Sequence, residues 1–119
     1  MNLFLIQKVS LLQNKGKDHW VPLFDYHNLT MAFENHNHIF KRSKKIKHFS
    51  ENSKGTLYLG EGSWGVKSKS DHQYDDRFIE KAWNTQCVWI ISINGSNTIK
   101  YEARDQNNSI LDSFESDIS

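Results

Sequence analysis

The chain has 119 residues, of which 37% are hydrophobic and 24% are charged, a composition typical of one globular domain and not of a disordered segment. Its 15 basic and 14 acidic residues leave a formal net charge of +1, which excludes the strongly positive field of a protein that binds nucleic acid or an anionic membrane surface. No apolar stretch is long enough to span a membrane, and no secretion signal is predicted, because the short apolar stretch near residue 1 has no basic residue before it.

The first third of the chain predicts one amphipathic helix. Asp18 is a plausible N-cap, and Pro22 lies near the expected first turn, where proline is best tolerated. Apolar residues then recur at helical spacing until the helix ends near Asn28. We expect its buried face to consist of Trp20, Leu23, Phe24 and His27.

Two short buried strands are predicted after this helix. Residues 30–33 form an apolar run of strand length, and residues 56–59 form a second run that ends in the glycine-rich turn 60–65. The segment 41–55 between them is rich in Lys, Ser and Asn, so we expect an exposed loop. Its cluster of basic side chains is interpreted as a solvated surface, with local attraction for an anionic substrate as the alternative. The polar segment 67–78 predicts a further, mobile loop.

The last third predicts an antiparallel meander. Residues 87–93 form a β-rich apolar run, and residues 98–104 alternate between apolar and polar side chains as a half-buried strand does. Residues 109–114 form the final strand. Turn residues at 94–97 and 105–108 separate the three strands.

Three side chains near this meander are predicted to be buried. Cys87, the single cysteine, precedes an apolar run, so we expect an inert buried thiol and no internal disulfide. Trp83 and Trp89 lie near or within a strand and are interpreted as core residues.

The sharpest chemical feature is the pair His36 and His38, which closely follows the first predicted strand. Neutral imidazole nitrogen is a good ligand for zinc and iron. On a strand both side chains would share one face and could hold one ion. On a loop past a strand end, where open sites are built, they could instead reach two adjacent ions. Because a His-x-His pair alone is a weak motif, a surface pair without metal is the alternative.

The surroundings of the pair resemble the purple acid phosphatases and their metallophosphoesterase relatives. In that family a helix leads into a buried strand, then to Gly-His-x-His, an aromatic residue and Glu-Arg, and the next strand ends in a glycine turn. The closing strands match the family's C-terminal meander in pattern. The resemblance covers roughly residues 17–115, and its specific part is residues 33–43 and 55–65. These two stretches include Asn35-His36-Asn37-His38-Ile39-Phe40-Lys41-Arg42-Ser43 and Thr56-Leu57-Tyr58-Leu59-Gly60-Glu61-Gly62-Ser63-Trp64-Gly65.

This resemblance implies an α/β (α+β mixed) fold, the C-terminal part of a metallophosphoesterase αββα sandwich, with mainly antiparallel strands and one or two helices. It implies that His36 and His38 each bind one of two metal ions (Fe, Zn or Mn), which lie about 3.5–4 Å apart and act together in phosphomonoester hydrolysis. Arg42 matches the family's arginine, and we assign it a supporting role in orienting the loop. A plain surface arginine is the alternative.

The chain departs from the family pattern at two matched positions and lacks several motifs. Asn35 stands where glycine is usual, and asparagine tolerates left-handed backbone well enough for the turn to survive. Lys41 replaces a glutamate, which removes one hydrogen-bond acceptor. The Asp-rich and Asn-His motifs that complete the family's metal centre do not occur in these 119 residues. His36 and His38 alone cannot complete a two-metal centre, so we expect the isolated chain to be inactive.

The sequence therefore predicts three parts. Residues 1–16 have no clear resemblance, residues 17–115 form a partial metallophosphoesterase domain, and residues 116–119 form a tail. The expected partners are a phosphate ester substrate and the missing N-terminal half of the domain, removed by truncation or by an incorrect gene model; neither nucleic acid nor a membrane is expected. The alternative is a non-enzymatic metal-binding or interaction module derived from this fold. No segment specifies a compartment, although related enzymes are often secreted or act in acidic compartments.

Overall fold

The computed structural model describes residues 5–6, 15–34, 40–60, 73–74, 77–95 and 97–118, which hold one helix and ten strands. The predicted mixed α/β fold with mainly antiparallel strands is confirmed. In chain order the elements are β1 (Leu5–Ile6), α1 (Lys15–Tyr26), β2 (Met31–Glu34), β3 (Phe40–Lys47), β4 (Ser50–Glu51), β5 (Thr56–Gly60), β6 (Gln73–Tyr74), β7 (Ile79–Trp83), β8 (Val88–Ile93), β9 (Thr98–Arg104) and β10 (Ile110–Asp117).

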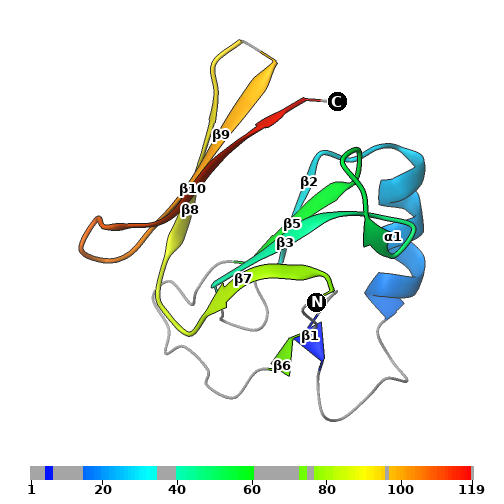
Figure 1. The fold of residues 1–119 in the computed structure, drawn as a ribbon, viewed down its shortest axis with the longest axis horizontal. Coiled ribbons are helices and arrows are strands. Elements are labelled where there is room, and N and C mark those ends of the chain that lie inside the picture. Colours follow the sequence, from blue (N-terminus) through cyan, green and yellow to red (C-terminus); the bar gives the residue numbers. More distant parts are fainter. Residues whose placement is uncertain are drawn as a thin grey trace.

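A five-stranded sheet forms the middle layer of the molecule. Its strands run in the order β2-β5-β3, and the far edge of β3 pairs with β7 along its first half and with β4 at its end. Only β2 and β5 are parallel to each other within this sheet. Helix α1 covers one face, and the antiparallel three-stranded sheet β10-β9-β8 covers the other (Figure 1). A two-stranded pair of β1 and β6 lies beside these layers.

Helix α1 begins at Lys15 and not at Asp18, so the predicted N-cap is wrong and Pro22 lies inside the helix. Its buried face is also displaced from the predicted one, because Val21 is fully buried whereas Trp20 and Leu23 are half exposed. The reason is a polar residue in a buried position. Asp25 accepts a hydrogen bond from the backbone N–H of His48 at 3.0 Å, which turns this flank of the helix toward the sheet.

Strand β3 replaces the exposed loop that was predicted over residues 41–55. Lys41 and Ser43 are buried, because both faces of the sheet are covered at this point. A bulge interrupts the pairing with β5 between Arg42 and Lys45. Within the bulge the Ser43 hydroxyl accepts a hydrogen bond from the Tyr58 backbone N–H at 2.8 Å, so a side chain fills a gap in the ladder.

Strand β7 was not predicted, and it changes the interpretation of Trp83. Phe78, at the end of the predicted mobile loop, is buried, and Ile79 after it belongs to the core beneath α1. Trp83 is 44% exposed and stacks on Phe40, so its assignment to the core is wrong. Trp89 is partly buried and packs against the residues between the two sheets, as predicted.

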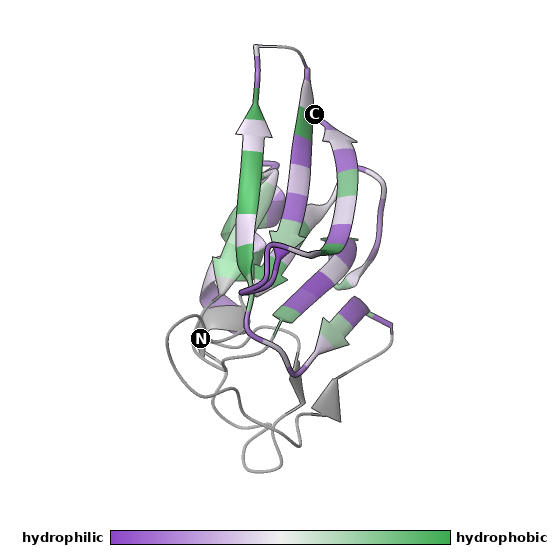
Figure 2. Cartoon of the chain, turned by 90° about the vertical axis from the view of Figure 1, so that its left-hand side faces the viewer, coloured by the Kyte–Doolittle hydropathy of each residue, from purple (hydrophilic) through white to green (hydrophobic). Residues whose placement is uncertain are grey.

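The C-terminal meander agrees closely with its prediction, although β10 extends to Asp117. Tyr101 and Ile99 of β9 pack against Leu57 and Leu59 of β5, forming the core between the sheets. Figure 2 shows the outer side of the meander, where β8 is mostly hydrophobic and β9 and β10 alternate in hydropathy. Cys87 is buried, as expected. Within the described residues no helix is long and apolar enough to cross a membrane.

Candidate functional site

The parallel strands β2 and β5 end side by side, with Glu34 opposite Gly60. Strand β3 begins at the same edge of the sheet, because Lys41 is also paired with Gly60. Phe40 in turn pairs with Trp83 at the end of β7. Four strand ends therefore meet at one edge, and the carboxyl ends of parallel strands are a common place for open sites in α/β folds.

The predicted metal ligands His36 and His38, together with Asn35, lie outside the described residues. They belong to the segment that connects the end of β2 to the start of β3. Within the described ranges, no group of three or more His, Cys, Asp or Glu side chains could hold a metal ion. The described histidines, which are His19, His27 and His48, are all exposed.

An aromatic cluster holds the strand ends together. The fully buried Phe40 ring lies between Trp83 and Trp89, with ring centroids 5.0 Å and 5.3 Å away. The indole N–H of Trp89 donates a hydrogen bond to the carbonyl oxygen of Gly60 at 3.0 Å. Trp89 therefore links the meander to the end of β5, and it does so at the edge from which the histidine-bearing segment departs.

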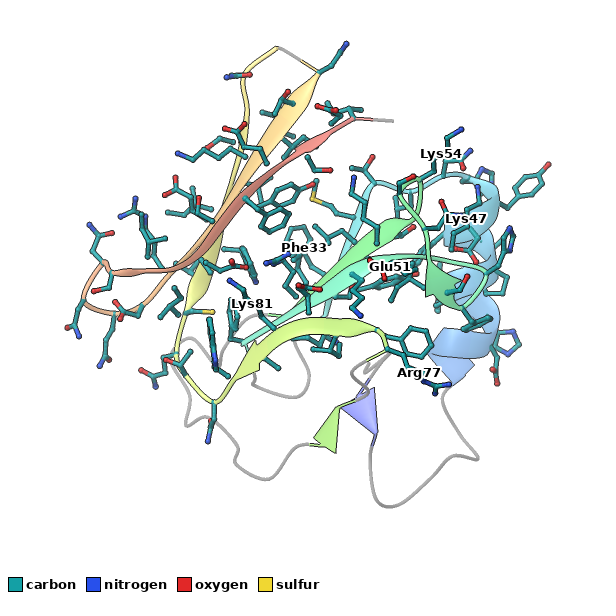
Figure 3. All side chains as sticks on the ribbon, viewed as in Figure 1. Phe33, Lys47, Glu51, Lys54, Arg77 and Lys81 are labelled. Carbon is teal, nitrogen blue, oxygen red and sulfur yellow. The ribbon has the colours of Figure 1, made fainter. Side chains whose placement is uncertain are left out.

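Arg42, the one predicted site residue that the structure describes, bridges the two sheets. Its Nε donates to Oδ2 of Asp112 at 2.6 Å, and its guanidinium lies 4.4 Å from the centroid of the Phe114 ring. Lys81, labelled in Figure 3, contacts the other carboxylate oxygen of Asp112 at 3.0 Å. The Asp112 side chain is almost completely buried, so two cations from the five-stranded sheet neutralise a carboxylate that belongs to β10.

Asp112, Lys81 and Phe114 were not recognised from the sequence. Asp112 lies 70 residues from Arg42 and 31 residues from Lys81, so no local spacing connects the three charges. A weak signal existed, because Asp112 interrupts the apolar side chains of a predicted strand. An acidic residue in such a position needs a cation nearby when it is buried.

A shallow cavity of about 390 Å³ lies between the bulge in β3 and the strand β10. It carries both signs of charge, since Lys44 and Lys45 face it together with Glu51, Glu80 and Glu115. This mixture of positive and negative side chains does not favour the binding of an anion in the cavity. The basic cluster of residues 41–47 is thus neither the predicted solvated loop nor a uniformly positive surface, because part of it is buried and part lies next to carboxylates.

Comparison with known proteins gives a structural match. No family model and no curated protein matches the sequence. Among solved structures, a purple acid phosphatase from yellow lupin (Lupinus luteus) seeds is similar, with a TM-score of 0.67 and 14% sequence identity over 80% of this chain. The match spans only 19% of the phosphatase chain. The protein therefore shares the fold of one part of a purple acid phosphatase.

Proposed function

We propose that this chain supplies the two-histidine part of a binuclear-metal phosphoesterase site. In this proposal His36 and His38 each bind one metal ion (Fe, Zn or Mn), and the substrate is a phosphate monoester. The remaining ligands come from polypeptide outside these 119 residues, and the chain alone is inactive.

One observation carries the proposal. The segment that bears both histidines directly follows the end of β2, at the edge where β2 and β5 end in parallel. The chain shares its fold with part of a purple acid phosphatase. Strand ends of this kind present short loops to an open site, and imidazole nitrogen suits the metals named above.

The described residues do not complete a metal centre, and so no catalytic step is assigned to this chain. When bound, a pair of such ions supplies charge stabilisation for phosphoryl oxygens and a water molecule of lowered pKa. The chain's own part is to hold two imidazoles near the strand ends. Arg42 contributes indirectly, because its ion pair with Asp112 anchors β3, which begins just after the histidine segment.

Metal titration of the purified chain tests the role of the histidines. We expect weak binding of Zn²⁺, measured by calorimetry and by the NMR shifts of the imidazole rings of His36 and His38. The His36→Ala/His38→Ala double variant should lose this binding. The matched control is His19→Ala/His27→Ala, which removes two exposed histidines, one within α1 and one directly after it, and should leave the affinity unchanged. Equal zinc affinity in the first double variant and the wild type would contradict the proposal.

A phosphatase assay tests the claim that the isolated chain is inactive. We expect no hydrolysis of a chromogenic phosphate monoester above the blank with added zinc, iron or manganese. Hydrolysis that disappears in the His36→Ala variant would show that the chain forms a complete site by itself. That result would overturn the incomplete-site part of the proposal while leaving the metal-binding part intact.

A further inference from the structure

Gly60, the last residue of β5, is the register partner of two residues that bracket the histidine-bearing segment 35–39. It lies opposite Glu34, where β2 ends, in the parallel pair. It also lies opposite Lys41, near the start of β3, in the antiparallel pair. Neighbouring strands are about 4.8 Å apart, so β5 holds the two ends of the segment on the order of 10 Å apart. A displacement of β5 at Gly60 would therefore displace both ends.

Trp89 contacts this arrangement at two points. Its indole N–H donates a hydrogen bond to the Gly60 carbonyl oxygen at 3.0 Å. Its ring also stacks on the ring of Phe40, the first described residue after the segment, with an angle of 22° between the ring planes. Phe40 is fully buried, so it cannot leave this stack without opening the core. Trp89 belongs to β8 of the meander, and it therefore joins the two ends of the segment to a second layer of the molecule.

The orientation of Trp89 is itself fixed. The ring of Phe114 meets the Trp89 ring edge-on, with 84° between the planes and 6.3 Å between the centroids. The backbone of Trp89 is paired with Ala103 in the meander. A residue that supports a binding site must have its own rotamer held by packing and hydrogen bonds. Trp89 meets both conditions, because its ring is packed and its only polar group is bonded to Gly60.

We propose that Trp89 is a positioning residue for the metal site proposed above. By holding Gly60 and Phe40, it fixes the two strand ends from which the segment bearing His36 and His38 departs. A segment with fixed ends has less conformational entropy to lose when its side chains bind an ion. Trp89 thus raises the affinity for the metal without being a ligand. This inference rests on the proposed function.

Zinc titration of a Trp89 variant tests this role. Trp89→Phe keeps an aromatic ring beside Phe40 but removes the N–H that binds Gly60. We expect it to weaken Zn²⁺ binding by about two- to tenfold, the effect of losing one hydrogen bond. Calorimetry measures the affinity, at a temperature at which the unfolding curve shows the variant to be folded.

Two control variants separate positioning from packing. Ile91→Ala, two residues further along the same face of β8, removes a side chain from the core between the sheets but not from the cluster around Phe40. Trp83→Phe keeps a ring on the other side of Phe40 and leaves the bond to Gly60 intact. Both should bind Zn²⁺ as tightly as the wild type, even where they lose stability. The inference is overturned if either control weakens binding as much as Trp89→Phe, or if Trp89→Phe binds as tightly as the wild type.

The indole proton of Trp89 supplies a second readout, in the wild type. Because coupling between two sites is reciprocal, Zn²⁺ should slow the exchange of this proton with solvent. The indole proton of Trp20, on the half-exposed side chain in α1, should exchange at an unchanged rate. This NMR measurement decides the question if Trp89→Phe does not fold.

The His36→Ala/His38→Ala variant distinguishes failure of this inference from failure of the proposed function. If the wild type binds no Zn²⁺, or if this double variant binds it equally well, the proposed function fails and the role of Trp89 fails with it. If the double variant loses binding while Trp89→Phe keeps the wild-type affinity, only the role of Trp89 is contradicted.

Discussion

The five-stranded sheet is covered on both faces, by α1 and by the meander, whereas the described residues cover the three-stranded meander on one face only. In the covered sheet all five residues of β5 are buried, and β3 holds a buried lysine and a bulge. In the meander, buried and exposed side chains alternate along β9. A sheet with two covered faces must satisfy its polar groups internally, while a sheet with one wet face can leave them in water.

Removing a side chain from the doubly covered sheet should have the largest effect. Leu59→Ala removes a fully buried side chain between the sheets and should lower the free energy of unfolding by about 2–5 kcal/mol. Ile90→Ala, on the exposed side of the meander, should cost less than about 1 kcal/mol. Urea unfolding of both variants checks this contrast. If both variants lose the same free energy of unfolding, side chains in the two sheets contribute equally to stability.

Asp112→Ala tests the ionic link between the two sheets. The change leaves Arg42 without its carboxylate in a mostly buried position. It should lower the free energy of unfolding by about 2–4 kcal/mol, a value that is reduced because solvent screens the partly exposed Lys81. Glu115→Ala on the same strand is exposed and serves as the control. The link has no energetic importance if thermal unfolding shows the two variants to be equally stable.

Tyr101→Phe should stabilise the protein. The Tyr101 hydroxyl is buried without a hydrogen-bond partner among the described residues, so its removal should raise the free energy of unfolding by about 1 kcal/mol. Burial also raises the pKa of Tyr101 above 10.0. The folded state of the wild type therefore loses stability as the pH rises through 10, and the variant should lose less. Denaturation at neutral and alkaline pH checks both effects, and a destabilised variant would indicate a partner for the hydroxyl.

Glu102→Gln, next to Tyr101 on β9, should have the smallest effect. The Arg104 guanidinium, and then Lys100, holds the pKa of Glu102 below its usual value of 4.5. The stabilisation is therefore present above pH 4.5 and is lost as the pH falls through the lower pKa of the folded state. Melting temperatures between about pH 5 and pH 3 should fall more steeply in the wild type than in the variant. If the melting temperatures of the two proteins fall equally with pH, these ion pairs do not stabilise the fold.

The contrast between the sheets also explains which elements the sequence could predict. The meander was predicted almost completely. One of its faces is in contact with solvent, so apolar and polar residues alternate along its strands, and its turns carry Asn and Gly. Strand β3 was predicted as a loop. Its buried lysine and its bulge disrupt the alternation of apolar and polar residues by which a strand is recognised in a sequence. Strand β7 was missed because its buried residues, Phe78 and Ile79, follow a polar segment.

For the candidate site, local sequence was informative and distant contacts were not. The resemblance, whose specific part is residues 33–43 and 55–65, led to the correct fold and identified His36 and His38, whose role as ligands stays a prediction. The partners of Arg42 could not be predicted, since Asp112 is brought to it only by the packing of one sheet on the other. The exposed aromatic stack at Trp83 depends in the same way on a strand pairing that no local pattern specifies.

The arrangement around β3 also has a consequence for the order of folding. The meander is built from neighbouring hairpins, which close in microseconds. Strand β3 instead needs β5 on one edge and β7 on the other, and its ion pair with Asp112 closes a separation of 70 residues. Because loop closure must precede such contacts, we expect the meander to form early and the central sheet to limit the refolding rate. Pulse-labelled amide exchange should then protect β9 before β3.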